Sequence, residues 1–231
     1  MSGVRGRYVS GRQREESILE AAAARFAQAG YVNTSLAAIA RDVGITQEGV
    51  LHYFPSKAHL LIAVHGRRMA EIQRWWGLLP AAPTAIDVFA RMQLSTTLFA
   101  NDPELVELSV LTAVETARLV KSKSSYEAAD HPRVVAAVTA HFAGCLERGD
   151  LSPDVDPERL ARQCIAMSDG LHFQWVICER AFDLASVCLD HLEYVARSVV
   201  PEDRLPADPR AAIAALAEEG LGDVAAADAA R

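Results

Sequence analysis

Two short amphipathic segments joined by a glycine constrain the fold of this chain more than any other feature. In residues 35–43 the apolar side chains recur at three- and four-residue steps, after Thr34 as the expected N-cap. Gly44 follows, and glycine readily adopts the left-handed conformation that ends helices. Residues 47–54 repeat the pattern, with Thr46 as the second expected N-cap. The sequence therefore predicts two short helices separated by a tight turn.

Longer helices are predicted on both sides of this pair. Residues 12–29 carry one apolar face and stop before Gly30. On the other side, Pro55 interrupts the chain, and Ser56 is the expected cap of a helix that continues to about residue 78. Two short helices braced by longer ones have the layout of a helix-turn-helix unit.

The remainder of the chain is also expected to be helical. Breaks near Pro83, Asn101, Gly149 and Pro201 separate long amphipathic segments. The predicted helices cover 84–101, 103–120, 132–148, 157–179 and 183–200. Residues 202–231 are rich in Ala, Asp, Glu and Pro, so we expect a mobile tail with one weak helix around 208–219. The predicted fold is all-α, with a head over 1–55, a helical body over 56–201 and a tail over 202–231.

Charge is distributed unevenly between head and body. The net charge is −7, but residues 1–70 carry nine Lys/Arg against five Asp/Glu, so this segment carries +4 and the rest of the chain −11. A basic head suits contact with phosphates, although ordinary surface variation is the alternative. The sequence has no long uncharged apolar run and its first residues lack the apolar core of a signal peptide, so we expect a cytoplasmic protein that does not enter the membrane. The four cysteines are expected to be buried, reduced thiols.

The second short helix presents side chains suited to a major groove. Val50 and Phe54 are expected to pin the helix onto the head. Gln can read adenine edges, whereas Tyr, His and hydroxyl groups can donate to phosphates. Lys57 and the start of residues 35–43 are further phosphate candidates, and the arginines before Glu15 form a basic arm that either follows DNA or is simply solvated. The expected DNA-binding residues are Thr34, Ser35, Thr46, Gln47, Gly49, His52, Tyr53 and Lys57.

Gly49 is unusual within this set. A glycine inside an exposed helix costs about 1 kcal/mol relative to alanine. Close approach of the helix backbone to DNA would compensate for that cost. The alternative is a surface glycine without a role.

These residues resemble the DNA-binding domain of TetR-family regulators. The similarity covers residues 12–65 and is carried by Ile18–Ala22, Phe26–Tyr31, Thr34–Ala40, Val43–Ile45 and Tyr53–Lys57. It implies an all-helical homodimer, a variable C-terminal ligand-binding core, and repression of transcription until an effector binds. Leu51 departs from the family pattern, in which a tyrosine commonly contacts phosphate, so one backbone contact is expected to be lost or transferred to His52 and Tyr53.

The body offers candidates for a dimer interface and an effector pocket, but no catalytic or metal-binding constellation and no cofactor motif. Residues 168–175 resemble the start of the penultimate helix of a TetR C-terminal subfamily, which implies a four-helix dimer interface. For both sets, packing inside the monomer is the alternative. The expected interface residues are Leu171, Trp175, Leu184, Val187, Leu192 and Val195. The expected pocket residues are Trp75, Trp76, Phe89, Met92, Phe99, Phe142, Met167 and Phe173.

The sequence thus favours a transcription regulator over an enzyme. A dimer predicts a palindromic operator on double-stranded DNA, and an apolar pocket predicts release by a small hydrophobic effector. The first alternative is a DNA-binding regulator without a small-molecule effector. The second is a helical enzyme or carrier that merely retains the head.

Overall fold

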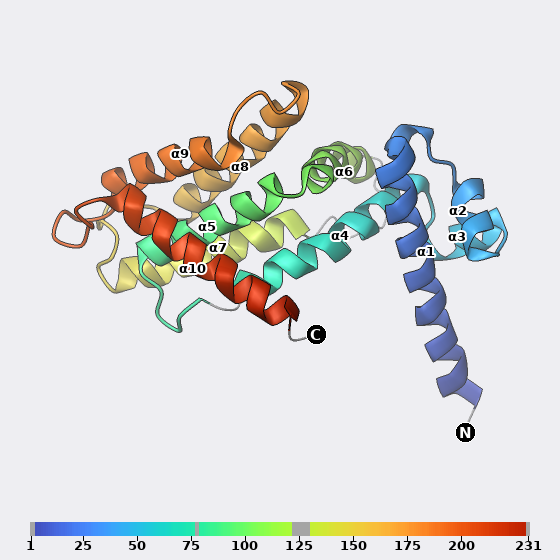
Figure 1. Ribbon diagram of the computed structural model, residues 1–231. Coiled ribbons are helices and arrows are strands. Elements are labelled where there is room, and N and C mark those ends of the chain that lie inside the picture. The colour runs from blue at the N-terminus through green and yellow to red at the C-terminus, as the bar shows by residue number, and fades with distance from the viewer. Residues whose placement is uncertain (1–2, 77–78, 122–129, 230–231) are drawn as a thin grey trace. The chain divides into compact units, whose positions relative to one another are not determined.

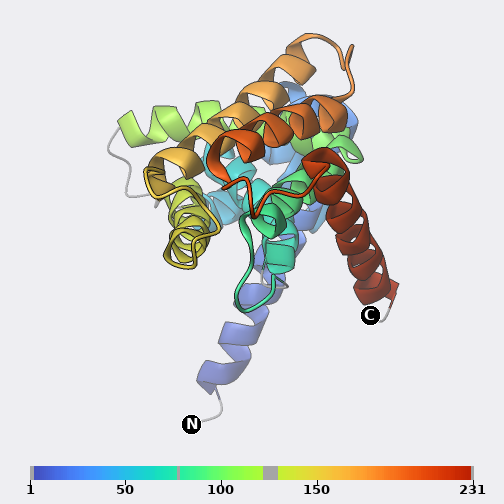
Figure 2. The same ribbon diagram turned by 90° about the vertical axis from the view of Figure 1, so that its left-hand side faces the viewer.

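The computed structural model describes residues 3–76, 79–121 and 130–229, without the side chains of 3–10, 71–75, 130 and 227–229. The described residues form helices and no strands, as the sequence predicts (Figures 1 and 2). The helices are α1 (Gly3–Asn33), α2 (Leu36–Val43), α3 (Gln47–Tyr53), α4 (Lys57–Trp76), α5 (Ala85–Ala100), α6 (Pro103–Lys121), α7 (Asp130–Glu147), α8 (Pro157–Ile177), α9 (Leu184–Val199) and α10 (Pro209–Ala229).

The chain divides into two compact units, and the division differs from the predicted domain boundaries. The first unit comprises Met1–Met69 and Leu111–Glu127, and the second comprises Ala70–Val110 and Ala128–Arg231. Helices α4 and α6 therefore each contribute residues to both units. Sequence patterns predict where each helix begins and ends, but they do not show which helices pack together. The last part of α6 could therefore not be assigned to the same unit as the head from the sequence.

The head is built around one small apolar core. Ile18, Ile39 and Val50, from α1, α2 and α3, are fully buried. Helix α2 packs on both α1 and α3. Helix α1 begins at Gly3, well before the expected residue 12, and its backbone leaves helical geometry at Gly30, which has φ of 74°. The predicted break at Gly30 is therefore present, although the helical turns resume beyond it.

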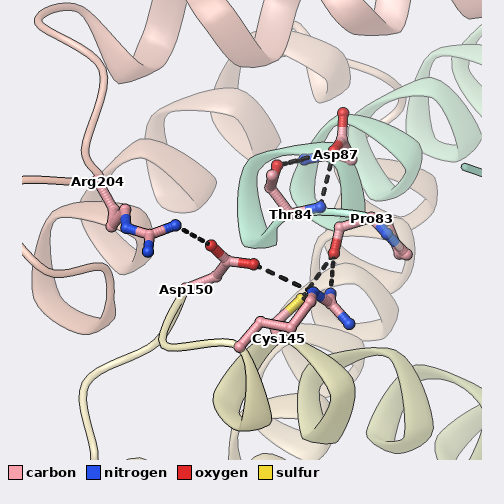
Figure 3. A network of polar contacts seen from close by, with 7 residues as sticks. Pro83, Thr84, Asp87, Cys145, Asp150 and Arg204 are labelled. Carbon is pink, nitrogen blue, oxygen red and sulfur yellow. Dashed lines mark hydrogen bonds and ion pairs between the residues drawn. The ribbon is translucent and has the colours of Figure 1, made fainter.

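The start of α5 is held by a polar network in the second unit (Figure 3). Thr84 and Asp87 form a capping box, in which each side chain accepts a hydrogen bond from the other residue's backbone N–H. The carbonyl of Pro83 accepts hydrogen bonds from Cys145 Sγ and from Arg148 at the end of α7. Asp150 is buried and pairs with Arg148 and with Arg204, which follows α9. The network ties three distant chain segments together.

Three of the four cysteines are buried free thiols as expected, whereas Cys178 is exposed and corrects that prediction. Cys178 is the C-cap residue of α8, so it lies beyond the packed part of that helix. None of the helices is long and apolar enough to span a membrane, within the residues that the structure describes.

The weak helix predicted around 208–219 is present, but it continues to residue 229 as α10, so the prediction of a mobile tail is wrong over 220–229. This helix packs against α5 and α9 (Figure 1). Its buried stripe consists of Ile213, Ala217, Gly220 and Val224 at four-, three- and four-residue steps. Small side chains give a weak hydrophobic signal in the sequence, yet they allow two helices to approach closely.

Gly220 provides a test of this packing. A Cβ atom at Gly220 would lie 2.7 Å from Leu94 Cδ2, and Leu94 is itself buried on α5. At Gly222 a Cβ would meet nothing within 4 Å. We expect Gly222→Ala to raise the free energy of unfolding by up to about 1 kcal/mol through helix propensity. Gly220→Ala should be less stable than Gly222→Ala by about 1–3 kcal/mol because of overpacking. Denaturant titration measures both, and equal stabilities would contradict the docking of α10.

Candidate nucleic-acid interface

The turn between α2 and α3 is closed at both helix ends. Ser35 is the N-cap of α2, and its Oγ accepts a hydrogen bond from Ala38 N at 3.1 Å. Gly44 adopts the left-handed conformation with φ of 69°, and its N–H donates to the last carbonyls of α2. Thr46 caps α3 by accepting from Gly49 N at 3.1 Å. The geometry is that of a helix-turn-helix.

Thr34 does not cap α2, which corrects the sequence-based expectation. Its side chain is 4% exposed, and its hydroxyl lies within hydrogen-bonding distance of two α1 carbonyls, Gly30 O at 2.9 Å and Arg25 O at 3.1 Å. The hydroxyl therefore fastens the end of α1 and faces the protein interior. Ser35, which is exposed, takes the position that was expected for Thr34.

Helix α3 has one buried side and one open side. Val50 and Phe54 are buried and hold the helix on the head, as expected. On the open side, Gln47 and His52 are exposed and Tyr53 is half-buried, with its ring 5.4 Å from that of His52. The open side thus presents amide, imidazole and phenol groups, which can bond to base edges and phosphates.

Sequence reasoning passed over two exposed charged residues of this surface. Glu48 lies on α3 beside Gln47, and its carboxylate can accept from a cytosine amino group. Arg41 lies in the last turn of α2 and can reach phosphate. Only their positions could have identified them, because both residues lie on the polar faces of helices that were already predicted to be amphipathic.

Lys57 is engaged inside the head. Its Nζ donates to the carbonyls of Tyr31 at 2.7 Å, Val32 at 3.1 Å and Thr34 at 2.8 Å. The ammonium also lies 4.4 Å from the centre of the Tyr31 ring, a cation–π contact. An ammonium group has three N–H donors, and three carbonyls use them. The structure therefore places Lys57 as the link between α4 and the end of α1, whereas the sequence predicted a phosphate contact.

A second link joins α1 to α2. Arg25 forms a two-pronged ion pair with Asp42, with Nε–Oδ2 at 2.6 Å and Nη2–Oδ1 at 2.7 Å. These hydrogen bonds lower the pKa of Asp42 and raise that of Arg25. Arg14 of the expected basic arm donates to the carbonyl of Val43 at the end of α2. The side chains of Arg5 and Arg7 lie outside the described residues. Both observed contacts fix the orientation of the helix-turn-helix on α1.

The expected pocket residues do not form one group. Phe89 and Phe142 are fully buried with their rings 5.5 Å apart, and Met92 and Phe99 are also buried. Trp76 is half-buried, donates to Ser95 Oγ at 3.1 Å and stacks on His141. Trp75 lies outside the described side chains. Met167 and Phe173 are exposed on α8, so these two do not line a cavity inside the second unit.

The expected dimer residues are mostly core residues of the monomer. Leu171, Trp175, Leu184, Leu192 and Val195 are buried, and Trp175 donates to the carbonyl of Phe182. Of the six residues, Val187 alone is exposed. Periodicity identified apolar faces on α8 and α9 but could not separate the face that packs inward from the one left open.

The open faces carry other large apolar side chains. Phe173 and Ile177 on α8 are 51% and 58% exposed, and Tyr194 on α9 is 73% exposed. Met167 and Val187 are partly exposed on the same two helices, which pack against each other. A Cβ at Gly170 on this face of α8 would meet nothing within 4 Å.

A helix-turn-helix head followed by a larger helical unit is typical of helix-turn-helix transcription regulators. Two family models match: bacterial regulatory proteins of the tetR family over residues 18–64, and the C-terminal domain of BetI-type transcriptional repressors over residues 124–200. The HTH-type transcriptional regulator RutR of Escherichia coli K12 is 32% identical over 165 residues, which cover 69% of this chain and 73% of that protein. The chain belongs to the TetR family.

Solved structures show the same fold at low sequence identity. SmeT, the repressor of a Stenotrophomonas maltophilia multidrug efflux pump, gives a TM-score of 0.60 at 22% identity, over 83% of this chain and 92% of that one. FadR of Bacillus subtilis, solved with stearoyl-CoA, gives 0.60 at 18% identity, over 79% and 97%. Regulators of this family bind DNA, act as dimers and are not enzymes, so the chain is a transcription regulator.

Proposed function

We propose that the chain represses transcription by binding a palindromic operator as a homodimer, and that a small apolar effector releases it. The observation that supports this most directly is the open side of α3. Its inner side is pinned by Val50 and Phe54, and the exposed groups of Gln47 and His52 remain available for a groove. Cytoplasmic location is part of the same proposal.

The DNA contacts divide into two kinds. Gln47, Glu48 and His52 are proposed to meet base edges, because they lie on the exposed side of α3. The proposed phosphate contacts are Ser35, Arg41, Thr46 and Tyr53, at the ends of α2 and α3. Thr34 and Lys57 are not among the proposed DNA contacts, because their polar groups form hydrogen bonds within the head.

The dimer is proposed to form through the open faces of α8 and α9. Exposed large apolar side chains on adjacent helices are typical of an interaction surface. Phe173, Ile177 and Tyr194 supply the apolar and aromatic groups that are enriched in such interfaces. Gly170 allows close approach of the partner helix. A two-fold axis through this face would place one α3 on each half of a palindromic operator.

The proposed function is tested by selecting DNA from a random pool with the purified protein near physiological salt. We expect a palindromic sequence to be enriched and its binding to weaken steeply as salt increases. Enrichment of asymmetric sites bound by monomers would contradict the dimeric arrangement. If no DNA sequence is enriched at any salt concentration, the proposed sequence-specific DNA binding is wrong.

Gly49→Ala tests whether the backbone of α3 approaches DNA. A Cβ at Gly49 would meet Ile45 at 3.5 Å, an ordinary contact, so the head should keep or gain stability through helix propensity. If the backbone lies against DNA, the added methyl group should weaken operator affinity by about tenfold or more, equivalent to about 1.4 kcal/mol. Gly222→Ala is the matched control. Unchanged affinity in Gly49→Ala would leave Gly49 as a surface glycine.

The alternative function is a DNA-binding regulator without a small-molecule effector. The open apolar faces also suit a different protein partner, which would then control the regulator. Operator binding measured with and without candidate small molecules separates the two. We expect at least one uncharged compound to weaken operator binding.

A further inference from the structure

Two buried polar side chains of the second unit each have one atom without a hydrogen-bond partner among the described residues. Gln93 on α5 is 5% exposed and His172 on α8 is 6% exposed. Gln93 Nε2 donates to the carbonyl of Ala185 at 3.0 Å. Among the described residues, neither Gln93 Oε1 nor His172 Nε2 has any hydrogen-bond partner. Native interiors pair nearly all such atoms, so these two require partners that the described side chains do not supply.

Both atoms belong to one strip of α5 and the helices packed on it. Gln93, Thr96 and Phe99 follow one another at three-residue steps along α5 and are buried. Thr96 Oγ1 lies 3.3 Å from Cys188 Sγ of α9, and the ring of Phe99 lies 4.6 Å from that of His172. Gln93 and Phe99 are separated by about 9 Å along the helix axis. The residues that carry the two unpartnered atoms therefore lie at the two ends of a strip no longer than a small molecule.

The strip is uncharged at neutral pH. Burial lowers the pKa of His172 to about 4, so its imidazole is neutral. Burial also raises the pKa of the Cys164 thiol to about 12 and that of Cys188 as well, so both remain protonated. A carboxylate or ammonium placed here would meet no opposite charge from these residues, which is strongly unfavourable in a buried site. Gln93 Oε1 can only accept a hydrogen bond, so its partner must be a donor.

We propose that this strip between α5, α8 and α9 binds an uncharged small molecule that carries a hydroxyl or amide group. The donor group bonds to Gln93 Oε1, the apolar body lies against Phe99, and a second polar group of the molecule meets His172 Nε2. This inference rests on the proposed function, because it names the chemical class of the effector.

The test uses three probes with one shared apolar body: 3-phenylpropan-1-ol, 3-phenylpropanamide and 3-phenylpropanoate. Binding to the full-length protein is measured by calorimetry and ligand-observed NMR. We expect the alcohol and the amide to bind and the carboxylate to bind at least tenfold more weakly. Gln93→Leu should weaken binding of both neutral probes at least tenfold, because the single polar group of each probe is the one that bonds to Gln93 Oε1. Gln174→Leu, an exposed glutamine on α8, is the matched control and should leave binding unchanged.

A second readout needs no probe. Replacing an unpaired buried polar group by an apolar one of similar size is neutral or stabilising. The ligand-free melting temperature of His172→Phe should therefore equal or exceed that of the original protein, whereas Gln93→Leu is left out of this readout because it also removes the hydrogen bond to the Ala185 carbonyl. A lower melting temperature of His172→Phe would mean that structural water satisfies His172 Nε2, and would overturn the proposal.

Three binding results would also overturn it: no binding of either neutral probe at millimolar concentration, binding of the carboxylate as tight as that of the alcohol, or binding that Gln93→Leu leaves unchanged. Operator binding of the same samples is measured separately. DNA binding without probe binding overturns only the ligand site. Probe binding without DNA binding overturns the proposed function and leaves the ligand site standing.

Discussion

A Lys57→Met variant is expected to unfold at a lower temperature than the original protein, in addition to binding DNA more weakly. The substitution removes the donors that meet the carbonyls of Tyr31, Val32 and Thr34, and it removes the cation–π contact with Tyr31. Hydrogen bonds from a charged group in a partly buried site contribute about 1.5–3 kcal/mol. For a chain of this length, that corresponds to a decrease of about 4–10 °C in melting temperature.

Arg41→Met is the matched control, because it also removes one cation from the head. Arg41 is exposed on α2 and is proposed to contact phosphate. Its loss should lower operator affinity and reduce the salt dependence of binding, with an unchanged melting temperature. If Lys57→Met behaves in the same way as Arg41→Met, Lys57 acts as a phosphate contact and its role as a link within the head is wrong.

Substitution of glutamate for both Phe173 and Ile177 is expected to convert a dimer into monomers. Both side chains are more than half exposed, so the monomer fold should tolerate the change. In a dimer they would be buried, and each fully buried large apolar side chain contributes about 1.5–3 kcal/mol. Loss of both should raise the dimer dissociation constant by about 100-fold or more. Sedimentation equilibrium measures this constant directly, and palindromic operator binding should weaken with it.

Ala136→Glu controls for added charge, since Ala136 is exposed on α7. It should leave the dissociation constant unchanged. Leu192→Ala provides the opposite comparison, because Leu192 is buried in the monomer and its truncation should cost about 2–5 kcal/mol of stability. If Leu192→Ala dissociates a stable dimer while the double glutamate variant remains dimeric, the interface lies on the faces first expected from the sequence.

Local patterns in the sequence determined the helices and the turn of the head. The steps of apolar residues, Gly44 and the cap at Thr46 are properties of neighbouring residues, and the predicted bodies of α2 and α3 are present. The same patterns located α5 to α9 to within a few residues. The all-α fold and the TetR family could therefore be predicted from the sequence.

Tertiary packing decided which atoms remain available for function. Thr34 and Lys57 had the right chemistry for phosphate, but the end of α1 lies beside them and its carbonyls occupy their polar groups. Likewise, Leu171 and Phe173 both sit on apolar α8, and only the packing of the neighbouring helices buries the first and exposes the second. Helix α10 was predicted only as a weak helix over 208–219, because Ala217 and Gly220 carry little apolar surface, although their small size is what lets the helix dock on α5. A sequence records the chemistry and the spacing of side chains, whereas exposure depends on contacts between segments far apart in the chain.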